Sequence, residues 1–119
     1  MNPLLVFVGG GIGAVLRYGV GRATALGGLG TPLATLAVNI LGCLTMGLLA
    51  GWFASRGGSE PARLFLLTGV LGGFTTFSAF GLDALTLWQR GPPGPAAAYV
   101  AASVILSLAA VALGFTLTR

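Results

Sequence analysis

Glycine and hydroxyl residues interrupt an apolar stretch between positions 69 and 80 of the sequence. Gly72 and Gly73 are adjacent, and Thr75, Thr76 and Ser78 follow them. Because glycine is a poor helix former, this composition predicts a break in a helix. Backbone carbonyls freed by a break inside a membrane can bind a cation, and freed N–H groups can bind an anion. The competing interpretation is a kinked packing helix whose threonines hydrogen-bond to their own preceding turn.

Two aromatic rings follow the predicted break. Phe77 and Phe80 are three residues apart, so on a helix they share one face. A phenyl ring has a negative face and a positive edge, which lets the edge face an anion without a formal positive charge. Ordinary packing is the simpler explanation for such a pair, and the sequence leaves both open.

Hydrogen-bond donors form two further stripes at helical spacing. Thr35 and Asn39 are four residues apart, and Tyr99, Ser103 and Ser107 repeat that spacing. All of these side chains can donate a hydrogen bond. A wet path lined by such donors and by ring edges, with no carboxylate, suits an anion. Alternatively, Asn39 bonds a neighbouring helix, because a buried amide needs a partner.

The other polar residues indicate no catalytic centre. The chain has no histidine and a single cysteine, Cys43, and it contains no P-loop and no grouped nucleophile and base. We therefore expect no enzyme activity. The arginines are dispersed, which argues against nucleic acid as a partner. We expect Arg17 to reach toward the membrane surface and Asp83 to lie near a helix end, within reach of an arginine.

The elements that hold these residues are predicted to be membrane-spanning helices. Hydrophobic residues make up 55% of the chain and charged residues 7%, against about 25% charged in soluble domains. Four apolar stretches, about 4–20, 32–54, 62–88 and 96–117, reach or approach the roughly 20 residues that cross a bilayer. We predict an all-α membrane protein with one domain over residues 1–119 and a third helix broken at mid-membrane.

The arginines divide evenly between the two ends of such a four-helix chain. Arg56, Arg63 and Arg119 fall on one side, and Arg17, Arg22 and Arg90 on the other. Orientation follows the Lys/Arg imbalance of short loops, so an even division predicts insertion in both orientations. Alternatively, the amino terminus or the lipid decides the orientation. Glycines four residues apart on several helices predict close packing and an oligomer.

Three ordered motifs resemble those of the CrcB/Fluc family of fluoride channels, and the resemblance covers nearly the whole chain. They are Gly9-Gly10-x-x-Gly13-Ala14-x-x-Arg17-Tyr18, Thr35-Leu36-x-Val38-Asn39-x-x-Gly42 and Gly72-Gly73-x-Thr75-Thr76-Phe77-Ser78-x-Phe80, with further similarity at Tyr99 and Ser103. The chain departs from the family pattern at Ala34, Val70, Leu71, Phe74 and Ala79. None of these departures alters the two phenylalanines or Asn39.

The resemblance implies an antiparallel, dual-topology homodimer with two fluoride pores, in the inner (plasma) membrane of a prokaryote. Phe77 and Phe80 would contact fluoride through their ring edges, and Asn39 would donate to it. The implied pore lining also includes Thr35, Ser78, Tyr99 and Ser103.

The same resemblance implies a metal site and a vestibule. The backbone carbonyls of Gly72 and Thr75 would hold a structural sodium ion (Na+) at the centre of the dimer, and Arg17 would line the vestibule. The implied activity is passive export of cytoplasmic fluoride down its electrochemical gradient, which relieves fluoride toxicity. A membrane potential, negative inside, favours anion exit by roughly 2.3 kcal/mol per 100 mV.

Two other functions fit a small four-helix membrane protein. A small multidrug-type proton-coupled antiporter needs a carboxylate within the membrane. The only acidic residues are Glu60, in a linker, and Asp83, near a helix end; an Asp83 at mid-membrane would favour the antiporter. A non-transporting assembly subunit would explain the glycines but not the polar stripes.

Overall fold

The computed structural model describes residues 2–119, and the regular elements within that range are helices. In chain order they are α1 (Asn2–Leu26), α2 (Thr31–Arg56), α3 (Glu60–Arg63), the π-helix η1 (Leu64–Leu71), α4 (Gly72–Phe74), α5 (Ser78–Arg90) and α6 (Pro93–Thr118). Four helical segments, namely α1, α2, the combined stretch Glu60–Arg90 and α6, are long and apolar enough to cross a membrane. The prediction of an all-α chain with four such helices is confirmed.

α1 continues well past the apolar stretch predicted at residues 4–20. The helix ends at a glycine and does not end where the apolar stretch ends. Gly28 has a φ of 84°, in the left-handed region. Its N–H donates to Ala25 O at 3.0 Å, and the N–H of Leu29 donates to Thr24 O at 2.9 Å. These two bonds form a Schellman motif, which satisfies the last carbonyls of the helix. The apolar pattern stops almost two turns before the helix does.

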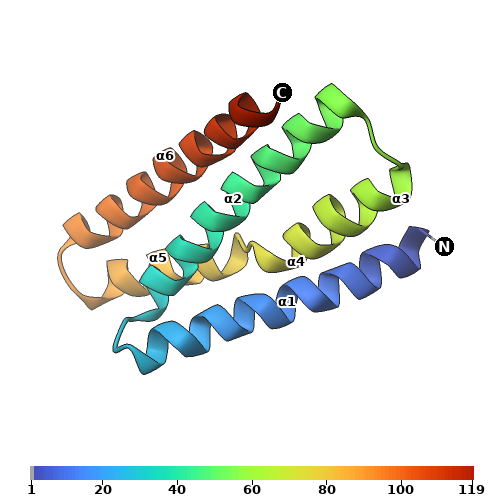
Figure 1. The fold of residues 1–119 in the computed structure, drawn as a ribbon. Coiled ribbons are helices and arrows are strands. Elements are labelled where there is room, and N and C mark those ends of the chain that lie inside the picture. Colours follow the sequence, from blue (N-terminus) through green and yellow to red (C-terminus); the bar gives the residue numbers. More distant parts are fainter. Residues whose placement is uncertain (1) are drawn as a thin grey trace.

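Consecutive spans run in opposite directions (Figure 1). α2 and α6 lie side by side, and α1 packs against η1 and α4. The start of α1, the α2–α3 connection and the carboxyl terminus lie at one end of the bundle, whereas the α1–α2 and α5–α6 connections lie at the other. The middle of the third span therefore meets both α1 and α2.

Glycines let two pairs of helices approach at backbone distance. A Cβ added to Gly13 of α1 would collide with Val70 O in η1, and one added to Gly47 of α2 would collide with Val111 O in α6. Small residues at such contacts are how membrane helices pack closely. Few large side chains are buried within the chain, Val38 being the most enclosed, and many apolar side chains of α1 and α6 are exposed. This outward apolar surface suits lipid or a partner of similar chemistry.

Candidate functional site

The helical backbone of the third span stops at Phe74 and resumes at Ser78 (Figure 1). Between them Thr75 adopts an extended conformation, with φ −84° and ψ 156°. The N–H and the hydroxyl of Thr75 both donate to Leu71 O, at 3.0 and 2.9 Å. The hydroxyl thus bonds to its own preceding turn, as the alternative interpretation of this segment expected, although the helix also loses its regular backbone here.

Asn39 of α2 holds the interrupted segment at Thr76. Its Nδ2 donates to Thr76 O and its Oδ1 accepts from the Thr76 N–H, each at 2.9 Å. Of the two interpretations of Asn39, the structure shows the bond to a neighbouring segment. A side-chain amide here replaces the two backbone partners that a continuous helix would have supplied to Thr76.

The Thr76 side chain also organises the start of α5. Its Oγ1 accepts from the Ala79 N–H at 3.1 Å, in the manner of a helix cap, and lies 3.3 Å from Ser78 Oγ. Ser78 itself is exposed. Ser78 therefore contacts the cap, and it lines neither of the two cavities described below.

The carbonyls of Gly72 and Thr75 are among those that the break leaves without their usual helical donors. In a continuous helix Gly72 O would accept from the Thr76 N–H, which instead donates to Asn39. Likewise Thr75 O would accept from the Ala79 N–H, which instead donates to Thr76 Oγ1. Within residues 2–119, no other donor bonds to either carbonyl. Free carbonyl oxygens at unwound membrane backbone suit a hard monovalent cation, so the donor set at Gly72 and Thr75 fits sodium.

Three aromatic rings form a row from the break toward α6. The ring centroids of Phe77 and Phe80 are 5.4 Å apart with an interplanar angle of 49°, and those of Phe80 and Tyr99 are 5.4 Å apart at 38°. Phe80 is only 9% exposed, whereas Phe77 is 82% exposed. Phe80 is therefore packed within the chain, and Phe77 presents its ring to the outside.

A cavity of about 320 Å³ lies beside these rings and is called the smaller cavity below. Its lining includes Asn39, Cys43, Phe77, Phe80, Ser103 and Ser107. Ser103 is 6% exposed, and its Oγ has no hydrogen-bond partner within the described part of the chain. A buried hydroxyl without a partner costs free energy. The smaller cavity therefore offers a free donor opposite aromatic rings.

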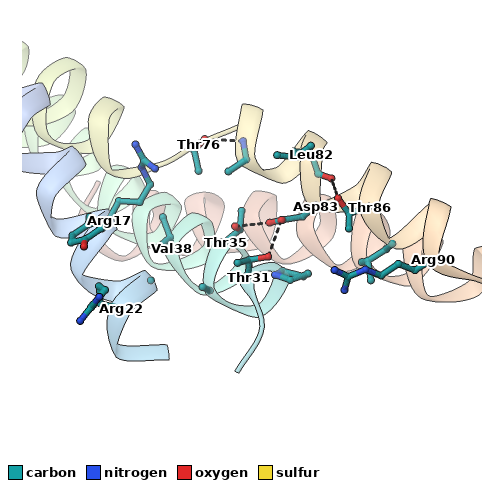
Figure 2. A pocket seen from close by; sticks show the side chains of 16 residues that line it. Arg17, Arg22, Thr31, Thr35, Val38, Thr76, Leu82, Asp83, Thr86 and Arg90 are labelled. Atoms are coloured by element: carbon teal, nitrogen blue, oxygen red, sulfur yellow. Dashed lines mark hydrogen bonds between the residues drawn. The ribbon is translucent and has the colours of Figure 1, made fainter. Parts of the chain in front are cut away.

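A cavity of about 590 Å³, the larger cavity, lies toward the α1–α2 connection. Figure 2 shows Arg17 and Arg22 of α1 on one side of it, Arg90 of α5 on the other, and Asp83 between them. Thr76 lines this cavity as well as the smaller one. The interrupted segment thus borders both.

Asp83 is buried at 9% exposure and accepts hydrogen bonds from three hydroxyls. Thr35 donates at 2.8 Å, Thr31 at 3.1 Å and Tyr99 at 3.5 Å (Figure 2 draws the two threonine bonds). No ion pair reaches this carboxylate in the described chain. Two expectations are therefore wrong: Asp83 is held by hydroxyls and not by an arginine, and the donor stripes do meet a carboxylate.

The predicted site residues fall into two groups joined at Tyr99. Asn39, Phe77, Phe80 and Ser103 surround the smaller cavity. Thr35 and Tyr99 instead bond to Asp83, while the Tyr99 ring touches Phe80. Sequence reasoning gave Thr76 and Asp83 no place in the site. The four-residue spacing of Thr31 and Thr35 was an available signal for Asp83, because two hydroxyls on one helix face suit a buried acceptor.

Comparison with known proteins places the chain in a family. The profile described as "CrcB-like protein, Camphor Resistance (CrcB)" matches residues 4–115. The chain belongs to the CrcB family. A protein of Paracoccus denitrificans (strain Pd 1222) is 58% identical over 98% of this chain and 93% of its own length. A protein of Methylobacterium nodulans is 52% identical over 100% of this chain and 97% of its own length. A third, of Rhodopseudomonas palustris (strain BisB5), is 50% identical over 100% and 98%.

Each of these three CrcB relatives is named "Fluoride-specific ion channel FluC". The family resemblance predicted from the three motifs is therefore confirmed. The matches extend over nearly all of both chains, so they cover the residues that form the break, the aromatic row and both cavities in this protein.

Proposed function

We propose that this protein is a fluoride-selective passive ion channel that exports cytoplasmic fluoride and thereby relieves fluoride toxicity. The observation that carries the proposal is its membership of the CrcB family, with full-length relatives at 50–58% identity named as fluoride-specific ion channels. The helices suit a multi-pass protein of a cell membrane, which in a prokaryote is the inner (plasma) membrane. The family and the names of its members indicate a channel and not an enzyme.

The smaller cavity supports the proposal chemically. Fluoride must exchange its tightly held water for donors of the protein, as ions do in other filters. Ser103 Oγ is a buried hydroxyl with no partner of its own, and the edges of Phe77 and Phe80 add positive electrostatic potential without a formal charge. Asn39 is already bonded to Thr76 through both amide groups. We therefore infer that Asn39 shapes the path and donates to fluoride through its second Nδ2 hydrogen.

The outward position of Phe77 supports an antiparallel homodimer with two pores. A phenyl ring that is 82% exposed on a single chain can complete an aromatic pair across a twofold axis. Three arginines lie toward each end of the bundle, five of them in helices and Arg119 directly after α6, and this balance supports insertion in both orientations. Each pore would then take its rings from both subunits.

The carbonyls of Gly72 and Thr75 support a structural sodium site in that dimer. Thr75 is the midpoint of the Glu60–Arg90 span, so the break would lie at mid-membrane. The ion would supply a positive charge that binds free carbonyl oxygens together. The chain itself presents those oxygens. The N–H groups that would otherwise donate to them bond instead to Asn39 Oδ1 and to Thr76 Oγ1.

The larger cavity would be the vestibule. Arg17, Arg22 and Arg90 line it and raise the local anion concentration. Asp83, at its inner side, is bonded to Thr35 and Tyr99, both of which belong to the proposed fluoride path. Each of these hydroxyls gives its one hydrogen to Asp83, so in this arrangement Thr35 and Tyr99 would shape the wall of the path and would not donate to fluoride.

A proton-coupled antiporter is less well supported. Of the two acidic residues, Glu60 begins the Glu60–Arg90 span at one end of the bundle, and Asp83 lies inside that span, eight positions past its midpoint, Thr75. At about 1.5 Å per residue, that is about 12 Å from mid-span. Three hydroxyls also bond its oxygens. If the protein were a non-transporting assembly subunit, the buried Ser103 hydroxyl would have no ligand to bond and its lack of a partner would be unexplained.

Fluoride efflux from liposomes tests the proposal. Purified protein is reconstituted with internal fluoride or chloride, a potassium ionophore dissipates the voltage, and an ion-selective electrode reads release. We expect rapid fluoride release and little chloride release, with loss of fluoride release in Phe80→Ile. Absence of fluoride release from well-reconstituted protein would contradict the proposal, and drug–proton exchange would then be assayed.

A further inference from the structure

Arg17 lies on the face of α1 that contacts the third span. Gly9, Gly13 and Arg17 follow one another at intervals of four residues, so they share one stripe of the helix. A Cβ on Gly9 would lie 2.6 Å from Phe65 O, and one on Gly13 would collide with Val70 O. The stripe therefore runs in backbone contact with η1, and Arg17 extends it toward the break.

The Arg17 side chain bonds to a carbonyl that the break has freed. In a continuous helix Gly73 O would accept from the Phe77 N–H, but the backbone leaves the helical path at Thr75. Arg17 Nε instead donates to Gly73 O at 3.3 Å. A cation at the carboxyl end of a helix is also favoured by the aligned peptide dipoles. Arg17 thus caps the half of the span that ends at Phe74.

Two contacts with α1 hold Gly73. A Cβ added to it would collide with Gly10 O, so the α1 backbone lies directly against it. The Arg17 hydrogen bond pulls its carbonyl toward the same helix. The two residues that follow Phe74 are Thr75, whose carbonyl is free, and Thr76, which Asn39 holds. The break is therefore anchored on one side by Arg17 and on the other by Asn39.

We propose that Arg17 is a positioning residue: its Nε–H fixes the Gly73 carbonyl and so sets the placement of the break and of Phe77 after it. The inference rests on the proposed fluoride channel and gives Arg17 a role separate from attracting anions to the larger cavity. Arg22 supplies the matched comparison. It lines the same cavity from the same helix, but its side chain makes no hydrogen bond within the chain as described.

Lysine separates the two roles. It keeps the positive charge, but a methylene stands where arginine has Nε, and the ammonium is a point charge without the planar fork. If charge in the cavity is what matters, lysine at either position preserves flux and glutamine at either position lowers it. If Arg17 positions the break, lysine at position 17 lowers fluoride flux, whereas lysine at position 22 preserves it.

The experiment compares Arg17→Lys, Arg17→Gln, Arg22→Lys and Arg22→Gln with wild type. Fluoride and chloride efflux are read at low and high salt, and amide hydrogen exchange of the peptide covering residues 74–78 is read in lipid nanodiscs. We expect Arg17→Lys to lose fluoride efflux by about tenfold or more, with a raised ratio of chloride to fluoride release and faster exchange in residues 74–78. Arg22→Lys should leave the exchange of residues 74–78 and the ratio of chloride to fluoride release as in wild type, and Arg22→Gln should lower fluoride efflux at low salt only.

Arg17→Lys with wild-type efflux, ion ratio and exchange would overturn the inference. If wild type releases no fluoride, the proposed function fails, and the exchange difference between Arg17→Lys and Arg22→Lys still decides the role of Arg17. If Arg17→Lys does not fold while Arg22→Lys does, exchange is read on Arg17→Gln. Protection of residues 74–78 unchanged from wild type would then count against the inference, and loss of protection would support it.

Discussion

The side-chain amide of Asn39 pairs with both backbone polar groups of Thr76, donating to the carbonyl through Nδ2 and accepting from the N–H through Oδ1, each at 2.9 Å. No other contact across the described helices satisfies two main-chain groups of the break at once. The pairing makes the shape of the third span depend on one residue of α2.

Asn39→Leu should therefore destabilise the protein and abolish fluoride efflux. The substitution keeps similar volume but leaves the partly buried Thr76 N–H and carbonyl without protein partners, at up to about 1–3 kcal/mol for each group. Stability is measured by thermal unfolding in detergent, and transport by liposome efflux. Thr45→Val is the control on α2, because the Thr45 hydroxyl bonds only to Leu41 O of its own helix and is exposed. Equal stability of the two variants would show that the amide does not hold the break.

The aromatic row predicts different consequences for its two phenylalanines. Phe80 packs between Phe77 and Tyr99, with centroids 5.4 Å from each, and is buried. Phe80→Ile should lower both stability and fluoride efflux, since each ring pair contributes about 0.5–1.5 kcal/mol beyond its buried area. Phe77→Ile should lower efflux with little loss of stability within one chain, because the Phe77 ring is exposed there.

Phe7→Ile on α1 is the control for the aromatic pair, since Phe7 is 76% exposed and lines neither cavity. It should leave thermal unfolding and efflux unchanged. If Phe77→Ile conducts as well as Phe7→Ile does, the ring at position 77 takes no part in the pore.

The Asp83 cluster predicts a coupled pair with Thr35. Thr35 Oγ1 donates to Asp83 Oδ2 at 2.8 Å in a buried setting, and a hydrogen bond to a charged group contributes about 1.5–3 kcal/mol. Thr35→Val and Asp83→Asn should each destabilise the protein, and the double variant should lose less than the sum of the two. The measurement is a double-mutant cycle of unfolding free energies in detergent.

Thr86→Val is the control for that cycle, because the Thr86 hydroxyl is exposed and bonds to Leu82 O one turn back. Strict additivity of Thr35→Val and Asp83→Asn would contradict a direct contact between them. Fluoride efflux of Thr35→Val, measured alongside, shows whether the hydroxyl also serves transport.

Most of the architecture was predictable because it depends on local composition. Stretches of apolar residues separated by Gly- and Pro-rich linkers indicate four spans without any knowledge of how they pack. Residue spacing placed Phe77 and Phe80 on one face, and Thr35 and Asn39 on another. The end of α1 was not predictable from apolarity, since Gly28 and its two hydrogen bonds decide it.

Residue spacing along the sequence could not predict which side chains of different spans contact one another. Thr35 and Asn39 share a face of α2, yet one bonds to Asp83 and the other to Thr76. Which partner each meets depends on how α5 lies across α2, and that depends on the break. The π-helical turns from Leu64 to Leu71 likewise left no mark in the sequence pattern, because the change from α to π geometry is a matter of backbone register.

The glycine contacts yield the last prediction, which separates packing from lipid exposure. Gly47→Ala should destabilise the protein by about 1–3 kcal/mol, because its Cβ would collide with the Val111 carbonyl across the α2–α6 contact. Gly19→Ala should stabilise it by about 0.5–1 kcal/mol through helix propensity alone, since no atom lies within 4 Å of an added Cβ there. Thermal unfolding of both variants in detergent provides the comparison. A loss of stability in Gly19→Ala would mean that this face of α1 meets a second protein chain and not lipid, which would define part of the contact in the proposed homodimer.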